Sequence, residues 1–171
     1  MSVDTAALSQ ESPTDIAWLP DGTFFITDGY GGKRVAKFDK DGKFLADWGM
    51  APKDPKNPGP NEFDTVHSID ISKDRRLFVV DRGHRRFQVF DENGKFLDMF
   101  TTGVRSSPYA HLTSTDQFLW VADGGTMRML KYEARAEVPA EAERGSDESD
   151  GPGAALSGDP VSLAQSAKCQ T

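Results

Sequence analysis

The chain has 171 residues, of which 37% are hydrophobic and 27% charged, enough apolar material for one compact domain at most. Its formal net charge is −7, and residues 133–171 carry most of it, with eight Asp or Glu against three Lys or Arg. Nucleic-acid binding relies on Lys and Arg to neutralise phosphates, so this balance argues against a nucleic-acid partner.

Export and membrane segments are not expected within this sequence. Residues 1–13 are polar and lack a basic stretch followed by an apolar run, and nowhere do 18 consecutive apolar residues occur. The single cysteine, Cys169, allows no intramolecular disulfide and no paired-cysteine metal site. We therefore expect no membrane partner, and the compartment stays open.

One pattern occurs three times along the first 132 residues. In each copy, two aspartates stand seven residues apart, and the run between them is rich in β-branched and aromatic residues. Short runs of this composition, bounded by Asp and Gly, are typical of β-strands. The aspartate pairs are Asp21 and Asp28, Asp74 and Asp81, and Asp116 and Asp123, which predicts strands at residues 23–27, 76–80 and 118–122.

A second alternating segment, which starts with arginine, follows each of these strands. These segments lie at residues 34–38, 86–90 and 128–132. The first two continue through hairpin turns at Asp41-Gly42 and Asn93-Gly94 into further strands at residues 43–48 and 95–100. Four antiparallel strands repeated about every 40 to 50 residues are typical of propeller blades. The predicted fold class is therefore all-β, a β-propeller with about three four-stranded blades at residues 13–49, 63–100 and 108–132.

The repeat ends after Tyr132, inside a blade. Residues 133–171 contain no aromatic residue, so we expect this acidic low-complexity tail to be disordered, and residues 1–12 form a polar N-terminal segment. The tail is either a native linker or the product of a shifted reading frame, and the break within a blade favours the second interpretation. Since propellers close with about 4 to 8 blades, we expect an incomplete ring whose open edges favour self-association.

Three polar side chains fall at one edge of neighbouring repeats. In an antiparallel hairpin, the start of the first strand and the end of the second lie at the same edge. His67 opens the first strand of the second copy and Arg82 follows its second strand, while Tyr30 follows the second strand of the first copy. We therefore predict that Tyr30, His67 and Arg82 converge near the mouth of the central channel.

The segments around these three residues resemble those of a known enzyme family. Residues 28–34 (DGYGGKR), 66–69 (VHSI) and 81–82 (DR) are similar, at matching spacing, to segments of the peptidyl-α-hydroxyglycine α-amidating lyases, which are NHL-repeat propellers. The resemblance covers residues 13–132. It implies a six-bladed propeller and a zinc-dependent lyase that cleaves a peptide ending in α-hydroxyglycine into a peptide amide and glyoxylate.

The same resemblance implies roles for individual residues. His67 would be one of three histidines, from different blades, that hold the zinc. Tyr30 would be the base that accepts the hydroxyl proton of the substrate, with zinc and Arg82 as the cations that lower a phenol pKa, ordinarily about 10. The family also binds Ca²⁺ through backbone carbonyls of its inner strands, so calcium is a second candidate ion. Family members that process secreted peptides are normally exported.

The sequence departs from the family pattern at the metal site. It offers no match for the other two histidine ligands, and Val66 replaces the proline that usually precedes His67. Catalytic zinc normally has three protein ligands, so we do not expect this chain alone to be an active lyase. The alternative is a non-catalytic NHL-repeat scaffold that binds a protein or peptide on its rim.

Each site residue also has a purely structural interpretation. His67 can be a strand-edge residue, Tyr30 a turn aromatic that packs on its neighbour, and Arg82 an ion-pair partner of Asp81 or Asp28. The recurring aspartates are expected to accept hydrogen bonds from the following turn or to pair with the arginine after it. These pairs are Asp28 with Arg34, Asp81 with Arg86, and Asp123 with Arg128.

Two further histidines are not expected at the site. His111 is in register with Ile16 and Ile69 in its repeat, which predicts an ordinary strand residue. His84 lies in a turn with three arginines, which predicts a solvated side chain.

Overall fold

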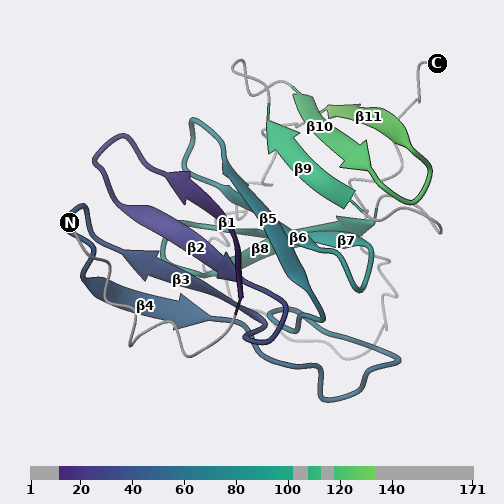
Figure 1. The fold of residues 1–171 in the computed structure, drawn as a ribbon, viewed down its shortest axis with the longest axis horizontal. Helices are drawn as coiled ribbons and strands as arrows, with labels where there is room; N and C mark the ends of the chain where they lie inside the picture. Colours follow the sequence, from purple (N-terminus) through teal and green to yellow (C-terminus); the bar gives the residue numbers. More distant parts are fainter. Residues whose placement is uncertain (1–11, 102–107, 113–117, 134–171) are drawn as a thin grey trace, which may run out of the picture.

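The strands predicted from alternation form in the computed structural model, which describes residues 12–101, 108–112 and 118–133 (Figure 1). Every regular element in these ranges is a β-strand, so this part of the chain has no helix that could cross a membrane. Most of the expected N-terminal segment and the acidic tail from residue 134 lie outside the described residues. Disorder of the tail and a shifted reading frame therefore stay predictions.

The strands form three antiparallel sheets, which we call blades 1 to 3. Blade 1 has the order β1 (Pro13–Trp18), β2 (Phe24–Asp28), β3 (Arg34–Phe38) and β4 (Phe44–Trp48). Blade 2 repeats it with β5 (Val66–Ile71), β6 (Leu77–Asp81), β7 (Arg86–Phe90) and β8 (Phe96–Thr101). Blade 3 contains β9 (Pro108–Leu112), β10 (Phe118–Asp123) and β11 (Arg128–Glu133).

The first strand of each blade lies next to the first strand of the following blade. β1 contacts β5, and β5 contacts β9, while blades 1 and 3 lie on opposite sides of blade 2 (Figure 1). This is the arrangement of propeller blades around a common axis, with the first strands innermost. The predicted fold class is confirmed, and the ends of the strands whose bounds were predicted differ by at most one residue.

Apolar side chains fill the junctions between successive blades. β2, β6 and β7 are buried along their whole length, because each lies inside its sheet and both of its faces are covered. Between blades 1 and 2 the core contains Phe25, Val35, Leu77, Val79 and Phe90. Between blades 2 and 3 it contains Phe78, Val80, Phe87, Leu119 and Val121. Alternate residues of β6 thus face opposite neighbours, as the period of a strand requires.

The recurring aspartates close the turn at the end of the second strand in each blade. Arg34 Nε lies 3.2 Å from Asp28 Oδ2, and Arg86 Nε lies 3.0 Å from Asp81 Oδ2. In blade 3, Asp123 accepts hydrogen bonds from the Gly125 amide and the Thr126 hydroxyl. Both predicted roles of these aspartates therefore occur.

Each of these turns ends in a residue with a left-handed backbone directly before the arginine. These residues are Lys33, Arg85 and Met127, with φ of 54°, 56° and 55°. The predicted hairpin glycines, Gly42 and Gly94, also have positive φ, of 85° and 82°.

Candidate functional site

The structure brings the three predicted site residues together on one rim of blades 1 and 2; we call Tyr30, His67 and Arg82 the rim cluster. The rings of Tyr30 and His67 meet edge to face, with centroids 6.0 Å apart and planes at 81°. Arg82 Nη1 donates a hydrogen bond to Tyr30 Oη at 3.3 Å. Tyr30 is 62% exposed, so a molecule in solvent can reach the phenol oxygen.

A close approach of two backbones brings the Tyr30 turn against β5. A Cβ atom built on Gly29 would lie 1.7 Å from the carbonyl oxygen of Val66, so no larger residue fits at this position. The Thr14 hydroxyl donates to the same carbonyl at 2.8 Å. Glycine therefore fixes the distance between the residue before Tyr30 and the residue before His67.

A β-bulge in β5 sets the direction of His67. Val66 pairs with Asp81, but Ile69 pairs with Val79, so His67 and Ser68 together oppose a single residue of β6. Bulges bend a strand and re-aim its side chains, and they are common beside active sites. The Asp15 carboxylate of blade 1 accepts a hydrogen bond from the Ile69 amide at 3.1 Å, which ties the end of the bulge to the neighbouring blade.

Burial and charge both favour the neutral form of His67. Partial burial lowers the pKa of the imidazole, the Arg82 cation lowers it further, and the Asp15 carboxylate opposes this shift. His67 Nδ1 lies 3.4 Å from the Ser68 hydroxyl. A neutral imidazole keeps a lone pair on one ring nitrogen, so His67 can accept a hydrogen bond or act as a metal ligand.

His84 is not a solvated turn residue, and that prediction was wrong. His84 Nδ1 lies 2.7 Å from Asp81 Oδ2, and its side chain is only 15% exposed. The left-handed residue Arg85 turns the chain back toward β7, which places His84 over the aspartate. Its contact with Asp81 is equivalent to the contact of Thr126 with Asp123 in blade 3.

His111 is a strand residue, as predicted, but its register differs from that of Ile16 and Ile69. It pairs with Trp120 of β10, three positions before Asp123, whereas Ile69 pairs with Val79 of β6, two positions before Asp81. The difference arises because β9 pairs without the bulge that displaces residues in β1 and β5.

The described residues do not form a zinc site. They contain no group of three or more His, Cys, Asp or Glu side chains placed to hold a metal ion. At the rim, His67 is the single histidine of the cluster, and its near neighbours are a phenol and a guanidinium. One imidazole beside a cation is too few ligands, in an unfavourable field, for catalytic zinc.

The residues that support the rim cluster were not predicted from the sequence. Thr14, Asp15 and Gly29 act through the backbone of β5, which lies between 37 and 54 residues further along the chain. A glycine directly after the repeated aspartate was the one available signal for the close approach. Such contacts between distant segments leave no periodic pattern in the sequence.

Comparison with known proteins identifies the repeats. No family model matches the sequence. Peptidyl-glycine alpha-amidating monooxygenase A of Xenopus laevis is 38% identical over 88 residues, covering 50% of this chain and 9% of that protein. A probable peptidyl-alpha-hydroxyglycine alpha-amidating lyase of Caenorhabditis elegans, pgal-1, is 35% identical over 79 residues, covering 46% of this chain and 22% of that protein. NHL repeat-containing protein 3 of Homo sapiens is 30% identical over 129 residues, or 71% of this chain and 35% of that protein.

The chain is a homologue of amidating lyases and NHL-repeat proteins. This NHL-repeat homologue spans between 9% and 35% of the length of those three relatives. Among solved structures, virginiamycin B lyase from Staphylococcus aureus matches with a TM-score of 0.57 at 17% identity, covering 72% of this chain and 39% of that one. The RRP9 WD40 repeats match with a TM-score of 0.56 at 21% identity, covering 72% and 36%. At these identities the structural matches establish the propeller fold of the NHL-repeat homologue and nothing further.

Proposed function

We propose that this chain is the substrate-binding part of an amidating-lyase-like propeller, and that its rim cluster receives the C-terminal α-hydroxyglycine of a peptide. The hydrogen bond from Arg82 to Tyr30, directly beside a neutral His67, is the observation that carries the proposal. The homology to peptidyl-alpha-hydroxyglycine alpha-amidating lyases supports the substrate class.

The chemistry of the cluster suits the groups of that substrate. Arg82 supplies the cation that a C-terminal carboxylate requires, since charge-assisted hydrogen bonds are the stronger ones. Tyr30 Oη accepts a hydrogen bond from Arg82, and the side chain is exposed to solvent, so a hydroxyl group of a bound peptide can reach the same oxygen. His67 offers the lone pair of a neutral imidazole on the same side.

The reaction of an amidating lyase breaks the bond between the α-carbon and the amide nitrogen. The α-hydroxyl group loses its proton, its oxygen becomes the aldehyde oxygen of glyoxylate, and the electrons of the broken bond pass to the nitrogen. The nitrogen then takes up a proton and becomes the primary amide. In this proposal, Tyr30 acts as a phenolate whose Oη accepts the hydroxyl proton and then delivers it to the leaving nitrogen, while Arg82 holds the carboxylate through the reaction.

In this proposal, the metal ions that the family binds would be held by an assembly larger than this chain. Because the described residues provide one histidine, zinc chemistry requires two further ligands, and no step is derived through zinc for this chain. The chain alone is expected to bind the peptide without releasing glyoxylate. Calcium binding by inner-strand carbonyls stays a proposal that a thermal shift with added Ca²⁺ would test.

Calorimetric titration with two short peptides tests the proposal. One peptide ends in α-hydroxyglycine, and the other is identical but ends in the primary amide. We expect the acid to bind more tightly, and Arg82→Ala to weaken its binding about 10-fold or more, because a hydrogen bond to a charged group contributes about 1.5–3 kcal/mol. Lys56→Ala removes one exposed cation from the loop between blades 1 and 2 and should leave binding unchanged. Equal affinity for both peptides, or no effect of Arg82→Ala, would contradict the proposal.

A non-catalytic scaffold is the second candidate, and the single histidine of the cluster favours it. A scaffold would bind a protein or peptide through its rim or its outer strands. In that case Tyr30→Phe would leave partner binding intact, whereas Leu45→Glu, on the exposed strand β4, would weaken it.

A further inference from the structure

The chain contains three asparagines, and Asn93 is the one that precedes a glycine. An asparagine loses its amide group when the backbone nitrogen of the next residue attacks the side-chain carbonyl carbon, and a following glycine leaves that attack unhindered. Asn57 precedes Pro58, whose nitrogen has no proton to lose. Asn61 precedes Glu62, a bulkier residue that is buried. Asn93 is therefore the asparagine whose surroundings favour this reaction.

Asn93 lies at the tip of the hairpin between β7 and β8, and its side chain is exposed to solvent. The Gly94 amide donates a hydrogen bond to the Asp91 carbonyl at 3.1 Å, and the Asn93 amide donates to Asp91 Oδ1 at 2.8 Å. Release of the first of these bonds frees the nitrogen that attacks, while the second still holds the turn. The reaction can therefore take place at the tip without unfolding of blade 2.

The packing between blades 1 and 2 requires the glycine that follows Asn93. Gly94 has a φ of 82°, and a Cβ atom built on it would lie 2.7 Å from a ring carbon of Trp48 in β4. A larger residue at position 94 would therefore collide with blade 1 as well as strain the turn. The contact between the two blades keeps the pair Asn93-Gly94 susceptible to deamidation.

A lysine of blade 1 contacts the amide group that would react. Lys37 Nζ of β3 donates a hydrogen bond to Asn93 Oδ1 at 3.3 Å. Attack on the side-chain carbonyl carbon places negative charge on this oxygen, and a cation directed at the oxygen stabilises that charge. The same ammonium group faces the carboxylate that remains once the amide is lost. Lys37 is therefore placed to assist the reaction and to hold its product.

The hairpin of blade 1 shows that an aspartate fits at the position of Asn93. Asp41 has this position in the hairpin between β3 and β4, and its amide donates to Asp39 Oδ1 at 2.9 Å. The Asn93 amide makes the same bond to Asp91 Oδ1. The Asp41 carboxylate pairs with Lys40 at 2.8 Å. An aspartate at position 93 therefore requires no change in the hairpin.

We propose that Asn93 is a site of spontaneous deamidation, and that the resulting aspartate pairs with Lys37 across the junction of blades 1 and 2. The Gly94 nitrogen bonds to Asn93 Cγ and gives up its proton, and the amide group leaves as ammonia. Water then opens the succinimide ring at one of its two carbonyls. Opening at Cγ restores the normal main chain, whereas opening at the main-chain carbonyl leaves isoaspartate and lengthens the turn by one carbon atom. Because the hydrogen bonds of Asp91 fix the length of this turn, the folded chain favours aspartate.

Deamidation changes the contact between the two blades from a neutral hydrogen bond to an ion pair. The change is covalent, so it accumulates with the age of the molecule. Lys37 and Asn93 lie outside the rim cluster, and the inference does not depend on the proposed lyase substrate. Failure of peptide binding would therefore leave it standing, and absence of deamidation would leave the peptide proposal standing.

Peptide mapping by mass spectrometry tests the site. The full chain is kept in warm, mildly alkaline buffer, and conversion of amide to acid is followed at all three asparagines. We expect conversion at Asn93, with aspartate as the main product, and Lys37→Met should slow it about 2-fold or more. Asn93→Gln keeps an amide oxygen for Lys37 but would have to form a larger ring, so its amide should persist. An unchanged Asn93, equally fast conversion at Asn61, or isoaspartate as the main product would overturn the proposal.

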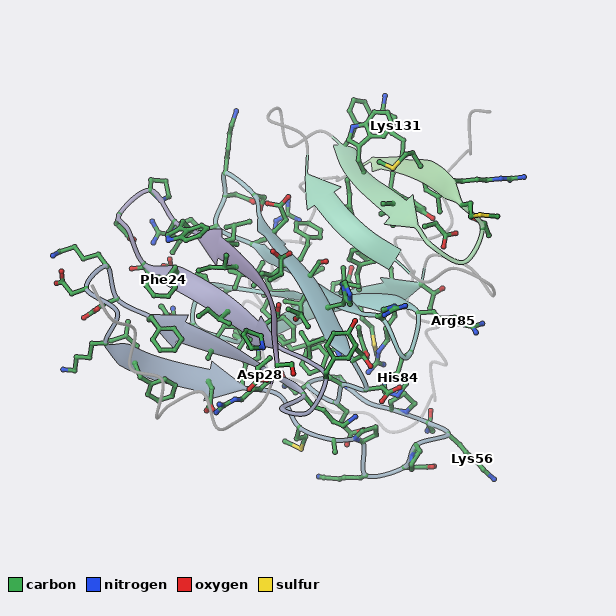
Figure 2. The ribbon with its side chains drawn as sticks, viewed as in Figure 1. Phe24, Asp28, Lys56, His84, Arg85 and Lys131 are labelled. Atoms are coloured by element: carbon green, nitrogen blue, oxygen red, sulfur yellow. The ribbon has the colours of Figure 1, made fainter. Side chains whose placement is uncertain are left out.

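A double-mutant cycle, measured by urea unfolding, tests the ion pair. Asn93→Asp supplies the product in uniform form, and Lys37→Met removes the ammonium group. We expect the two changes to be coupled by about 2- to 5-fold in the unfolding equilibrium constant, as for other exposed ion pairs, and added salt should weaken the coupling. Lys56→Met is the matched control, because Figure 2 shows Lys56 at the outer end of the loop between blades 1 and 2, pointing away from the sheets. Absence of coupling with Lys37→Met, or equal coupling with Lys56→Met, would rule out the pair.

Discussion

Arg82 acts on both other members of the rim cluster, as a hydrogen-bond donor to Tyr30 and as a charge beside His67. Burial is the larger cause that lowers the pKa of His67, and the guanidinium adds to it. An unfolded histidine titrates near 6.5, so the unfolded chain binds this proton more readily than the folded chain. Protonation of His67 therefore favours unfolding once the pH falls below about 6.5.

Arg82→Ala should raise the pKa of His67, because the variant removes the cation and leaves the burial of the ring largely intact. Proton NMR can follow the titration, since the chain contains three histidines whose ring signals separate. The Arg82→Ala variant should also lose less stability than the native chain does when the pH falls from 6.5 to 5. Lys56→Ala is the control and should leave the His67 titration unchanged. An unshifted His67 in Arg82→Ala would show that the charge does not act on the ring.

Gly29→Ala should destabilise the protein and separate Tyr30 from His67. The new methyl group would overlap the Val66 carbonyl oxygen, and overpacking of this kind costs about 3 kcal/mol. Urea unfolding measures the loss of stability, and peptide titration measures the loss of the cluster. Gly59→Ala is a matched control, because its Cβ atom would lie 3.8 Å from the nearest Glu62 oxygen, an ordinary contact. Equal losses in the two variants would contradict the role of the close approach.

The long connection between blades 1 and 2, residues 49–65, is held by one buried arginine of β7. Arg86 Nη1 donates to the Pro58 carbonyl at 2.8 Å, and its Nη2 donates to the carbonyls of Gly59 and Glu62 at 3.0 and 2.6 Å. The same guanidinium pairs with Asp81. The repeated arginine of blade 2 therefore anchors the connection as well as the turn.

Arg86→Leu should lower the free energy of unfolding by about 3–5 kcal/mol, because it leaves the buried Asp81 carboxylate without its cation. Arg86→Lys should not restore stability, since a single ammonium group cannot reproduce the fork that reaches three carbonyls. Urea unfolding measures stability, and limited proteolysis reports release of residues 49–65. Lys40→Ala, at an exposed ion pair, should behave like the native chain. Full rescue by lysine would mean that charge alone matters at this position.

The elements could be predicted because the signal for a strand is local. Alternation in residues 34–38 and 86–90, and the turn residues Asp41-Gly42, predicted β3, β7 and the hairpin to β4. The bulge at His67, the backbone approach at Gly29 and the anchor at Arg86 could not be predicted. Each depends on a partner in another blade, and the residue type alone does not reveal that partner.

At the scale of the whole molecule, the sequence repeat predicted the blades. The contacts at the junctions between blades depend on how their side chains pack and could not be predicted in the same way. Spacing of Asp28, Asp81 and Asp123 was enough to predict successive blades, and the rim cluster followed from strand direction. The misplacement of His84 has the same origin as the missed contacts, since a turn rich in basic residues gives no sign of a buried carboxylate below it.

The rim turns differ in length while their framework stays constant. Asp28 and Arg34 are six positions apart, whereas Asp81 and Arg86, like Asp123 and Arg128, are five apart. All three turns nevertheless finish with a left-handed residue that delivers the arginine to the same place. The turn with the additional residue is the one that carries Tyr30. Gly29 and Gly32 of this turn leave no room for a larger side chain, whereas Tyr30 is 62% exposed. The position of Tyr30 is therefore the place where this turn can change its recognition chemistry, much as a hypervariable loop does on an antibody scaffold, without rebuilding the blade beneath.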